Sequence, residues 1–221
     1  MAFKPALVVV DFQQDFCPPT GSLAVPDGLS ILPVLNTLLS YPFPLKIATR
    51  DWHPPDHVSF AANHSRLPQN SATAVITHPT DPSQSYVTAL WPVHCVQDTP
   101  GAEIVPGLHV RELHRVIDKG MDPRVEMYSA FYDPFHVSDS GLAKLLKDEG
   151  VTDVFVVGLA ADFCVKATAE HAFDEGFRTY IVHEATKPVF PETWGECSDK
   201  ITGKGIKLVS MDGPELARLR A

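Results

Sequence analysis

Reactive side chains follow four separate apolar runs of this sequence. Asp11 follows the first run, Asp51 and His53 follow the second, Lys119 the third, and Cys164 lies in the turn after the fourth. A single aspartate after a strand is commonly a helix cap, but capping alone does not explain four such positions. Because ligands bind at the carboxyl ends of strands in an open parallel sheet, these residues are candidates for one site.

Cys164 is the candidate nucleophile. It is expected at a strand-to-helix turn, where free backbone N–H groups and the helix dipole favour a thiolate and can hold an oxyanion. Asp11 offers a base for the thiol proton, and Lys119 offers a cation that favours both anions. The other three cysteines, Cys17, Cys95 and Cys197, have no comparable setting and are interpreted as structural.

Asp51 and His53 are spaced to share a metal ion. Residues i and i+2 of an extended segment point to the same side, and a carboxylate with an imidazole suits a divalent ion such as Zn²⁺, Fe²⁺ or Mn²⁺. Two ligands are too few, and His57 and His94 are the nearest candidates for a third. Three aromatic residues in nearby loops either pack or form a slot for a flat ring: Phe16, Trp91 and Tyr128.

Six short apolar runs must position these side chains. They are rich in Val and Ile, as is typical of parallel strands covered on both faces, and they span residues 6–10, 45–49, 115–117, 154–159, 179–182 and 206–209. Amphipathic stretches that predict helices span residues 30–39, 141–147, 165–174 and 214–220. This alternation predicts an α/β fold, a doubly wound three-layer sandwich with a mostly parallel six-stranded sheet.

Two regions interrupt the alternation of strands and helices. Residues 52–105 are rich in proline and show little periodicity, and so long an irregular connection is usually functional. Residues 120–137 form a second insertion, and the sequence leaves open whether residues 122–137 are a lid or a subunit contact. No linker is evident, so we expect residues 1–221 to form a single domain.

Composition excludes several classes of partner. The 221 residues carry 18 Lys and Arg against 27 Asp and Glu, a net charge of −9 without a basic run, which argues against nucleic-acid binding. The apolar run at residues 6–10 is too short for a membrane span or a signal peptide, so no membrane association is expected. A reducing, cytoplasmic location with free thiols is the default expectation.

Taken in order, six segments resemble the nicotinamidases, which belong to the isochorismatase-like cysteine hydrolases. The segments are residues 10–16, 50–54, 90–96, 118–120, 128–131 and 158–165. The resemblance covers about residues 5–190, and the loop lengths are similar to those of fungal members. The Asp, Lys and Cys positions alone would fit the whole superfamily, whereas their combination with the motifs at residues 51–53 and 91–95 is specific.

The resemblance implies an activity: hydrolysis of nicotinamide to nicotinate and ammonia through a thioester, a step of NAD salvage. It implies a catalytic triad of Asp11, Lys119 and Cys164. It also implies a cis peptide between Ala160 and Ala161 at the oxyanion turn, although the family's usual polar residue is Ala161 here. The oligomeric state, a homo-oligomer included, and the range of pyridine carboxamides remain open at this stage.

The resemblance also resolves the metal and substrate sites. It implies Asp51, His53 and His94 as ligands of a divalent metal, with Zn²⁺ the expected ion and waters completing the shell. His57 matches an extra ligand of some members, but its shorter spacing from His53 leaves it outside the expected shell. The pocket aromatics of the family correspond to Phe16, Trp91 and Tyr128.

Two alternatives are kept. One is another small-amide hydrolase of the superfamily, of the carbamoylsarcosine or ureidoacrylate type, whose members lack the Asp-x-His and second His set. The other is a non-catalytic metabolite-binding module on the same fold. Against the second, no Gly-x-Gly-x-x-Gly motif follows the first predicted strand, where the sequence is instead residues 11–15.

Overall fold

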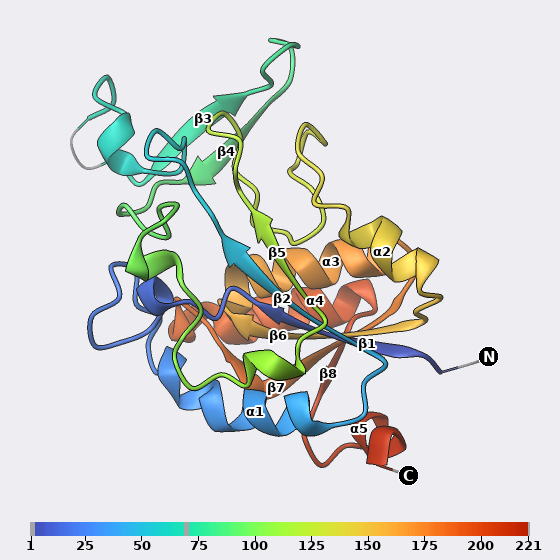
Figure 1. Ribbon diagram of the computed structural model, residues 1–221. Coiled ribbons are helices and arrows are strands. Elements are labelled where there is room, and N and C mark those ends of the chain that lie inside the picture. Colours follow the sequence, from blue (N-terminus) through green and yellow to red (C-terminus); the bar gives the residue numbers. More distant parts are fainter. Residues whose placement is uncertain (1–2, 69–70, 221) are drawn as a thin grey trace.

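A six-stranded parallel sheet forms the centre of the protein in the computed structural model (Figure 1), which describes residues 3–68 and 71–220. The strand order is β5-β2-β1-β6-β7-β8, and every neighbouring pair is parallel. The strands are β1 (Pro5–Val10), β2 (Leu45–Asp51), β5 (Arg115–Lys119), β6 (Asp153–Leu159), β7 (Arg178–Lys187) and β8 (Lys207–Val209). All six predicted strands are confirmed. The outermost residues of the expected domain, 1–2 and 221, lie outside the described residues.

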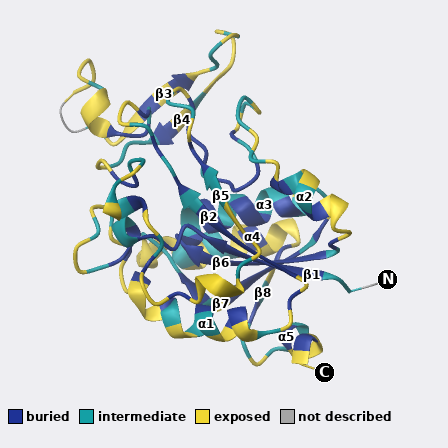
Figure 2. Ribbon diagram, viewed as in Figure 1, coloured by how far each residue is buried: buried dark blue, intermediate teal, exposed yellow. Residues whose placement is uncertain are grey.

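Helices cover both faces of the sheet. One face carries α1 (Leu32–Ser40) and α5 (Pro214–Arg220), and the other carries α2 (Leu142–Asp148), α3 (Lys166–Asp174) and α4 (Trp194–Lys204). Alternation along β1 explains this division, because Leu7 and Val9 pack with Leu35 of α1 while Val8 packs with Leu142 of α2. Figure 2 shows the central strands buried and the outer helix faces exposed, which confirms the predicted three-layer sandwich.

One hairpin and one helix were not predicted from the sequence. Within the region interpreted as irregular, β3 (Thr73–Thr77) and β4 (Ser85–Ala89) form an antiparallel hairpin that projects from the sheet. Both strands are short, and Val75 and Val87 form an exposed pair, so little periodicity marks them. The sequence of α4 contains Gly195 and Gly203 and buries only Ile201 fully, which hides its helical pattern.

Short turns complete the backbone. The 3₁₀ segments are Gln14–Phe16, Gly28–Ile31, Ala61–Asn63, Pro100–Ala102, Val110–Glu112 and Pro191–Thr193, and a π-helical turn spans Ala161–Val165. No described helix has the length and apolarity needed to cross a bilayer. The four cysteines are free thiols, as expected.

Parallel register brings the ends of four strands together at one edge of the sheet. Val10 pairs with Gly158, so the residues after β1 and β6 emerge side by side. Asp51 pairs with Lys119, which aligns the ends of β2 and β5 in the same way. The predicted site is therefore expected at the carboxyl ends of these four strands.

Candidate active site

Lys119 is the centre of a buried charge cluster at this edge. Its Nζ lies 3.0 Å from Asp11 Oδ2, 2.5 Å from Asp51 Oδ1 and 3.7 Å from Cys164 Sγ, and it also donates to the Met127 carbonyl at 3.1 Å. Burial alone would lower the pKa of Lys119, but the surrounding anions outweigh burial and hold its pKa well above the usual value. The structure thus brings together the three residues predicted as a triad.

Asp11 is placed for proton transfer by its backbone and by one hydroxyl. It follows β1 in the left-handed region, with φ of 45°. Thr49 Oγ1 donates to Asp11 Oδ1 at 2.6 Å and accepts from the Asp11 N–H at 3.2 Å. Burial raises the pKa of Asp11 to about 6, although the Lys119 charge opposes that rise. At neutral pH Asp11 is therefore a carboxylate that is more basic than usual.

Cys164 lies in the turn between β6 and α3, as predicted, and it is 6% exposed. The turn position favours a thiolate, but burial outweighs it: burial raises the pKa of the Cys164 thiol well above its usual value, with Lys119 opposing and Asp11 reinforcing the rise. The resting side chain is thus a thiol, so it needs a base when it attacks a substrate.

The cis peptide bond is one residue earlier than predicted. It joins Leu159 to Ala160, not Ala160 to Ala161. The reason is that β6 ends at Leu159 and the chain turns directly there, so the bend precedes the pair of alanines. Ala160 lines the pocket beside Cys164, whereas Ala161 is fully buried and outside the pocket lining.

Asp51, His53 and His94 form a group with the composition of a metal site. Their ligand atoms lie within 4.8 Å of one another and all three residues are buried. His53 Nδ1 bonds to the Gly120 carbonyl and His94 Nδ1 to the Pro92 carbonyl, each at 2.8 Å. These bonds leave the Nε2 atoms for a metal, the arrangement by which outer carbonyls usually orient histidine ligands.

The charge states of Asp51 and His94 also suit a cation, whereas burial is outweighed at His53 by the Asp51 carboxylate, which raises the pKa of that imidazole. Burial acts to raise the pKa of Asp51, but Lys119 and His53 outweigh it and hold the pKa below its usual value. Burial lowers the pKa of His94 to about 4, so this imidazole is neutral, as a metal ligand must be. The donor set of one carboxylate and two imidazoles fits a divalent ion such as Zn²⁺.

His57 lies beside this group and not within it. Its ring stacks on that of His53 with the centroids 4.0 Å apart, and its Nδ1 bonds to Ser59 Oγ at 2.8 Å. His53 and His57 form a second close group with Glu126, which sequence reasoning missed. Glu126 is 3% exposed, and burial raises its pKa to about 7. It comes from the 120–137 insertion, which therefore forms part of the site wall.

An aromatic slot opens above Cys164. Its walls include the three predicted residues Phe16, Trp91 and Tyr128, and the slot with its open mouth encloses about 350 Å³. Trp91 Nε1 donates to the Tyr128 hydroxyl at 3.0 Å, which fixes two walls relative to each other. Sequence reasoning missed other residues of the lining: Leu23, Val25, Phe163 and Val189. Phe163 was within reach, because it directly precedes Cys164.

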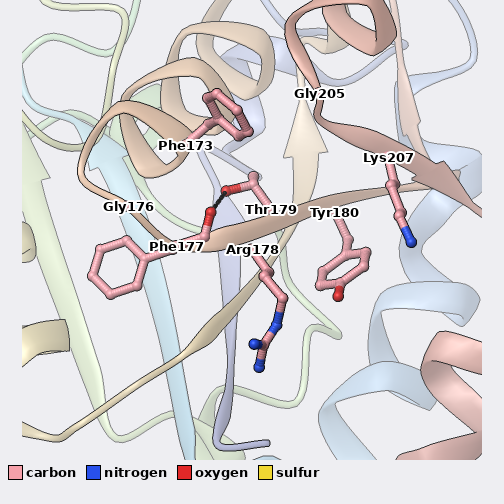
Figure 3. A pocket seen from close by; sticks show the side chains of 8 residues that line it. All are labelled: Phe173, Gly176, Phe177, Arg178, Thr179, Tyr180, Gly205 and Lys207. Carbon is pink, nitrogen blue, oxygen red and sulfur yellow. Dashed lines mark hydrogen bonds between the residues drawn. The ribbon is translucent and has the colours of Figure 1, made fainter. Parts of the chain in front are cut away.

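A second cavity lies at the opposite, amino-terminal ends of the strands, around the starts of β7 and β8 (Figure 3). It encloses about 700 Å³ with its open mouth, twice the aromatic slot. Its cationic side chains are already paired, Arg178 with Asp153 at 2.5 Å and Lys207 with Glu215 at 3.8 Å. Chemically, the slot above Cys164 is the better candidate for catalysis despite its smaller size.

The fold and this cluster define a class of protein. The family model of the isochorismatase domain matches residues 5–211, and the chain belongs to that family. Within it, the chain is similar to nicotinamidases. The nicotinamidase of Schizosaccharomyces pombe is 40% identical, and the match covers 100% of this chain and 99% of that protein. This fungal relative agrees with the loop lengths noted in the sequence.

Solved structures show the same likeness. The yeast nicotinamidase bound to the inhibitor nicotinaldehyde has a TM-score of 0.87 at 33% identity, over 93% of this chain and 99% of that chain. The pyrazinamidase of Pyrococcus horikoshii, in complex with zinc, has a TM-score of 0.74 at 35% identity, over 94% of this chain and 99% of that chain.

Proposed function

We propose that this chain is a nicotinamide amidohydrolase, which converts nicotinamide to nicotinate and ammonia. The single observation that carries this proposal is the position of Cys164. Its sulfur lies 3.7 Å from Lys119 Nζ, and it opens into an aromatic slot that His94 and Asp51 also line. A nucleophile, a base and a three-ligand metal group thus meet at one slot with aromatic walls.

Cys164 acts as the nucleophile and Asp11 as its base. Asp11 takes the thiol proton as sulfur attacks the amide carbon, and backbone N–H groups of the turn at Cys164 and its alanine pair hold the oxyanion. The C–N bond breaks as Asp11 returns the proton to the departing ammonia. Water, deprotonated by Asp11, then attacks the thioester, releasing nicotinate and restoring the thiol. Lys119 stabilises the charges of Asp11 and the sulfur.

Asp51, His53 and His94 would hold the divalent ion, for which Zn²⁺ is our proposal. When bound, such an ion would supply Lewis acidity toward the ring nitrogen of a pyridine. The aromatic side chains of Phe16, Trp91 and Tyr128 flank the ring and hold its carboxamide toward Cys164.

Ammonia release from nicotinamide by the purified protein with added Zn²⁺ tests the proposal. We expect release by the parent and none by Cys164→Ala, which should still bind nicotinamide because the slot and metal ligands remain. Asp11→Asn should be nearly as inactive, because the thiol loses its base. Absence of release from the zinc-loaded parent would refute nicotinamide as substrate, and release by Cys164→Ala would refute the nucleophile.

A further inference from the structure

The loop that follows the base carries two more polar side chains, the buried Gln13 and the half-buried Asp15, which the proposed mechanism leaves unused. We propose that Gln13 and Asp15 are positioning residues that hold the metal ligands Asp51, His53 and His94 at coordinating distance. The inference rests on the metal centre of the proposed function. Neither side chain belongs to the ligand group itself, so both would act through the backbone of other residues.

Gln13 clamps the backbone of Asp51. Its side chain is 0% exposed. Oε1 accepts from the Asp51 N–H at 2.8 Å, and Nε2 donates to the Asp51 carbonyl at 2.8 Å. Nε2 also donates to the Ala102 carbonyl at 2.8 Å. A carboxamide is needed here, because one side chain must accept and donate at the same residue. The clamp fixes the last residue of β2, from which the carboxylate ligand extends.

Asp15 holds the backbone that connects the two histidine ligands. Its Oδ2 accepts from the Cys95 N–H at 2.7 Å, while the Cys95 carbonyl accepts from the His53 N–H at 3.0 Å. Cys95 directly follows His94 and has a φ of 46°, a conformation that a non-glycine residue adopts at a cost. The Asp15 contact therefore supports the unusual turn that aims His94 and joins it to His53.

The surrounding loop is built closely around the Asp15 carboxylate. A Cβ added at Gly101 would lie 2.2 Å from Asp15 Oδ2, so a side chain there would force the carboxylate to move. Gly101 belongs to the same segment as Ala102, whose carbonyl Gln13 contacts. The backbones of all three ligands thus share one hydrogen-bonded frame with the loop that begins at Asp11.

If this frame positions the metal ligands, its loss should weaken metal binding. Loss of an outer contact to a metal ligand typically weakens binding by about 10–100-fold. Gln13→Met keeps the length and removes all the hydrogen bonds of the amide, and Asp15→Ala removes the contact to Cys95. Asp15→Asn retains an oxygen that can accept the Cys95 N–H, so it serves as the conservative variant. Gln14→Ala is the matched control, a glutamine of the same loop whose side chain has no place in this frame.

The experiment is competition for Zn²⁺ between each metal-free protein and a chelator of known affinity, with the melting temperature of each metal-free form recorded alongside. We expect Gln13→Met and Asp15→Ala to bind Zn²⁺ about 10–100-fold more weakly than the parent. Asp15→Asn and Gln14→Ala should stay close to the parent. A folded Asp15→Ala variant carries the test if Gln13→Met does not fold.

The outcomes separate this inference from the one on which it rests. Parent affinity in the Gln13→Met and Asp15→Ala variants, even with lowered melting temperatures, would overturn the positioning role and leave the metal centre standing. A parent protein that binds no Zn²⁺ would overturn the metal centre itself and this inference with it.

Discussion

Lys119 is a fully buried cation that two carboxylates share. Asp11 Oδ2 and Asp51 Oδ1 both contact its ammonium, while Asp51 Oδ2 faces His53 Nε2 at 3.5 Å. Asp51 therefore connects the proposed metal group to the proposed catalytic group through its two oxygens. Buried charges are tolerated only when they are paired, so each of these residues constrains the protonation of the others.

The pH dependence of the reaction follows from Asp11. Burial raises its pKa to about 6, and only the carboxylate form can take the Cys164 proton. We expect kcat/KM to be near its plateau above this pKa and to fall roughly tenfold per pH unit below it. A pH profile of kcat/KM under conditions of constant metal loading measures this. A profile that stays flat well below pH 6 would contradict the assignment of Asp11 as the base.

Thr49 offers a way to move that profile. Its hydroxyl donates to Asp11 Oδ1 at 2.6 Å, a contact that favours the ionised carboxylate and so lowers its pKa. Thr49→Val removes the donor and keeps the shape, so the acidic limb should move up by about one pH unit. Thr49→Ser keeps the hydroxyl and should leave the limb in place. Equal profiles for the two variants would show that the hydroxyl does not tune the base.

At the residue level, sequence reasoning placed the proposed triad and the three metal-ligand positions, because each follows a recognisable apolar run or motif. It missed Thr49, Gln13 and Glu126. Thr49 precedes Asp51 by two residues on the same strand face, so alternation could have indicated it. The other two are found only through tertiary contacts, because a Gln or Glu in a loop carries no local signal of burial.

At the scale of elements, the close approach of β1 and β6 brings base and nucleophile together. Gly158 is the point of contact: a Cβ there would lie 2.0 Å from the Val10 carbonyl oxygen, and its φ is 107°. A side chain at this position would separate the two strands just before Asp11 and before the turn that contains Cys164. The glycine thus serves the geometry of the site as well as the sheet.

We expect Gly158→Ala to lower the free energy of unfolding by roughly 3 kcal/mol or more, since it combines strain with a backbone clash. Turnover should fall with it even in the folded fraction. Gly195→Ala is the matched control, because that glycine lies in α4 with open space around it, and alanine there should stabilise by about 0.5–1 kcal/mol. Urea unfolding measures the free energy of unfolding of both variants. Equal values for the two would contradict the role of Gly158 as the contact between β1 and β6.

The elements predicted from the sequence are those whose burial requires a recognisable pattern of apolar residues. The central strands β1 and β6 are almost wholly apolar because helices cover both faces. The β3–β4 hairpin and α4 pack on one side only, or with few buried residues, so their local sequence favours them weakly. The cis bond was misplaced by one residue because no residue type marks such a bond outside proline.

At the scale of the whole molecule, the metal group joins distant parts of the chain. Asp51 ends β2 and His53 follows it, whereas His94 lies within the excursion of residues 52–105, beyond the β3–β4 hairpin. Backbone hydrogen bonds from the His53 N–H to the Cys95 carbonyl and from the Gln97 N–H to the His53 carbonyl already close this long loop. A cation bound by all three side chains would close it a second time, and only in the folded state.

Metal removal should therefore destabilise the entire fold and not the site alone. Binding to the native state alone contributes about 2.7 kcal/mol when free Zn²⁺ is about 100 times its Kd. For a chain of this size that raises Tm by roughly 5–10 °C. Calorimetry of the chelator-treated protein with and without added Zn²⁺ measures the shift, and His94→Ala should abolish it, whatever the Tm of its own metal-free form. A zinc-dependent shift that persists in His94→Ala would place the ion elsewhere. Without this histidine, an ion held by Asp51 and His53 would no longer connect the end of β2 to the segment that contains residue 94.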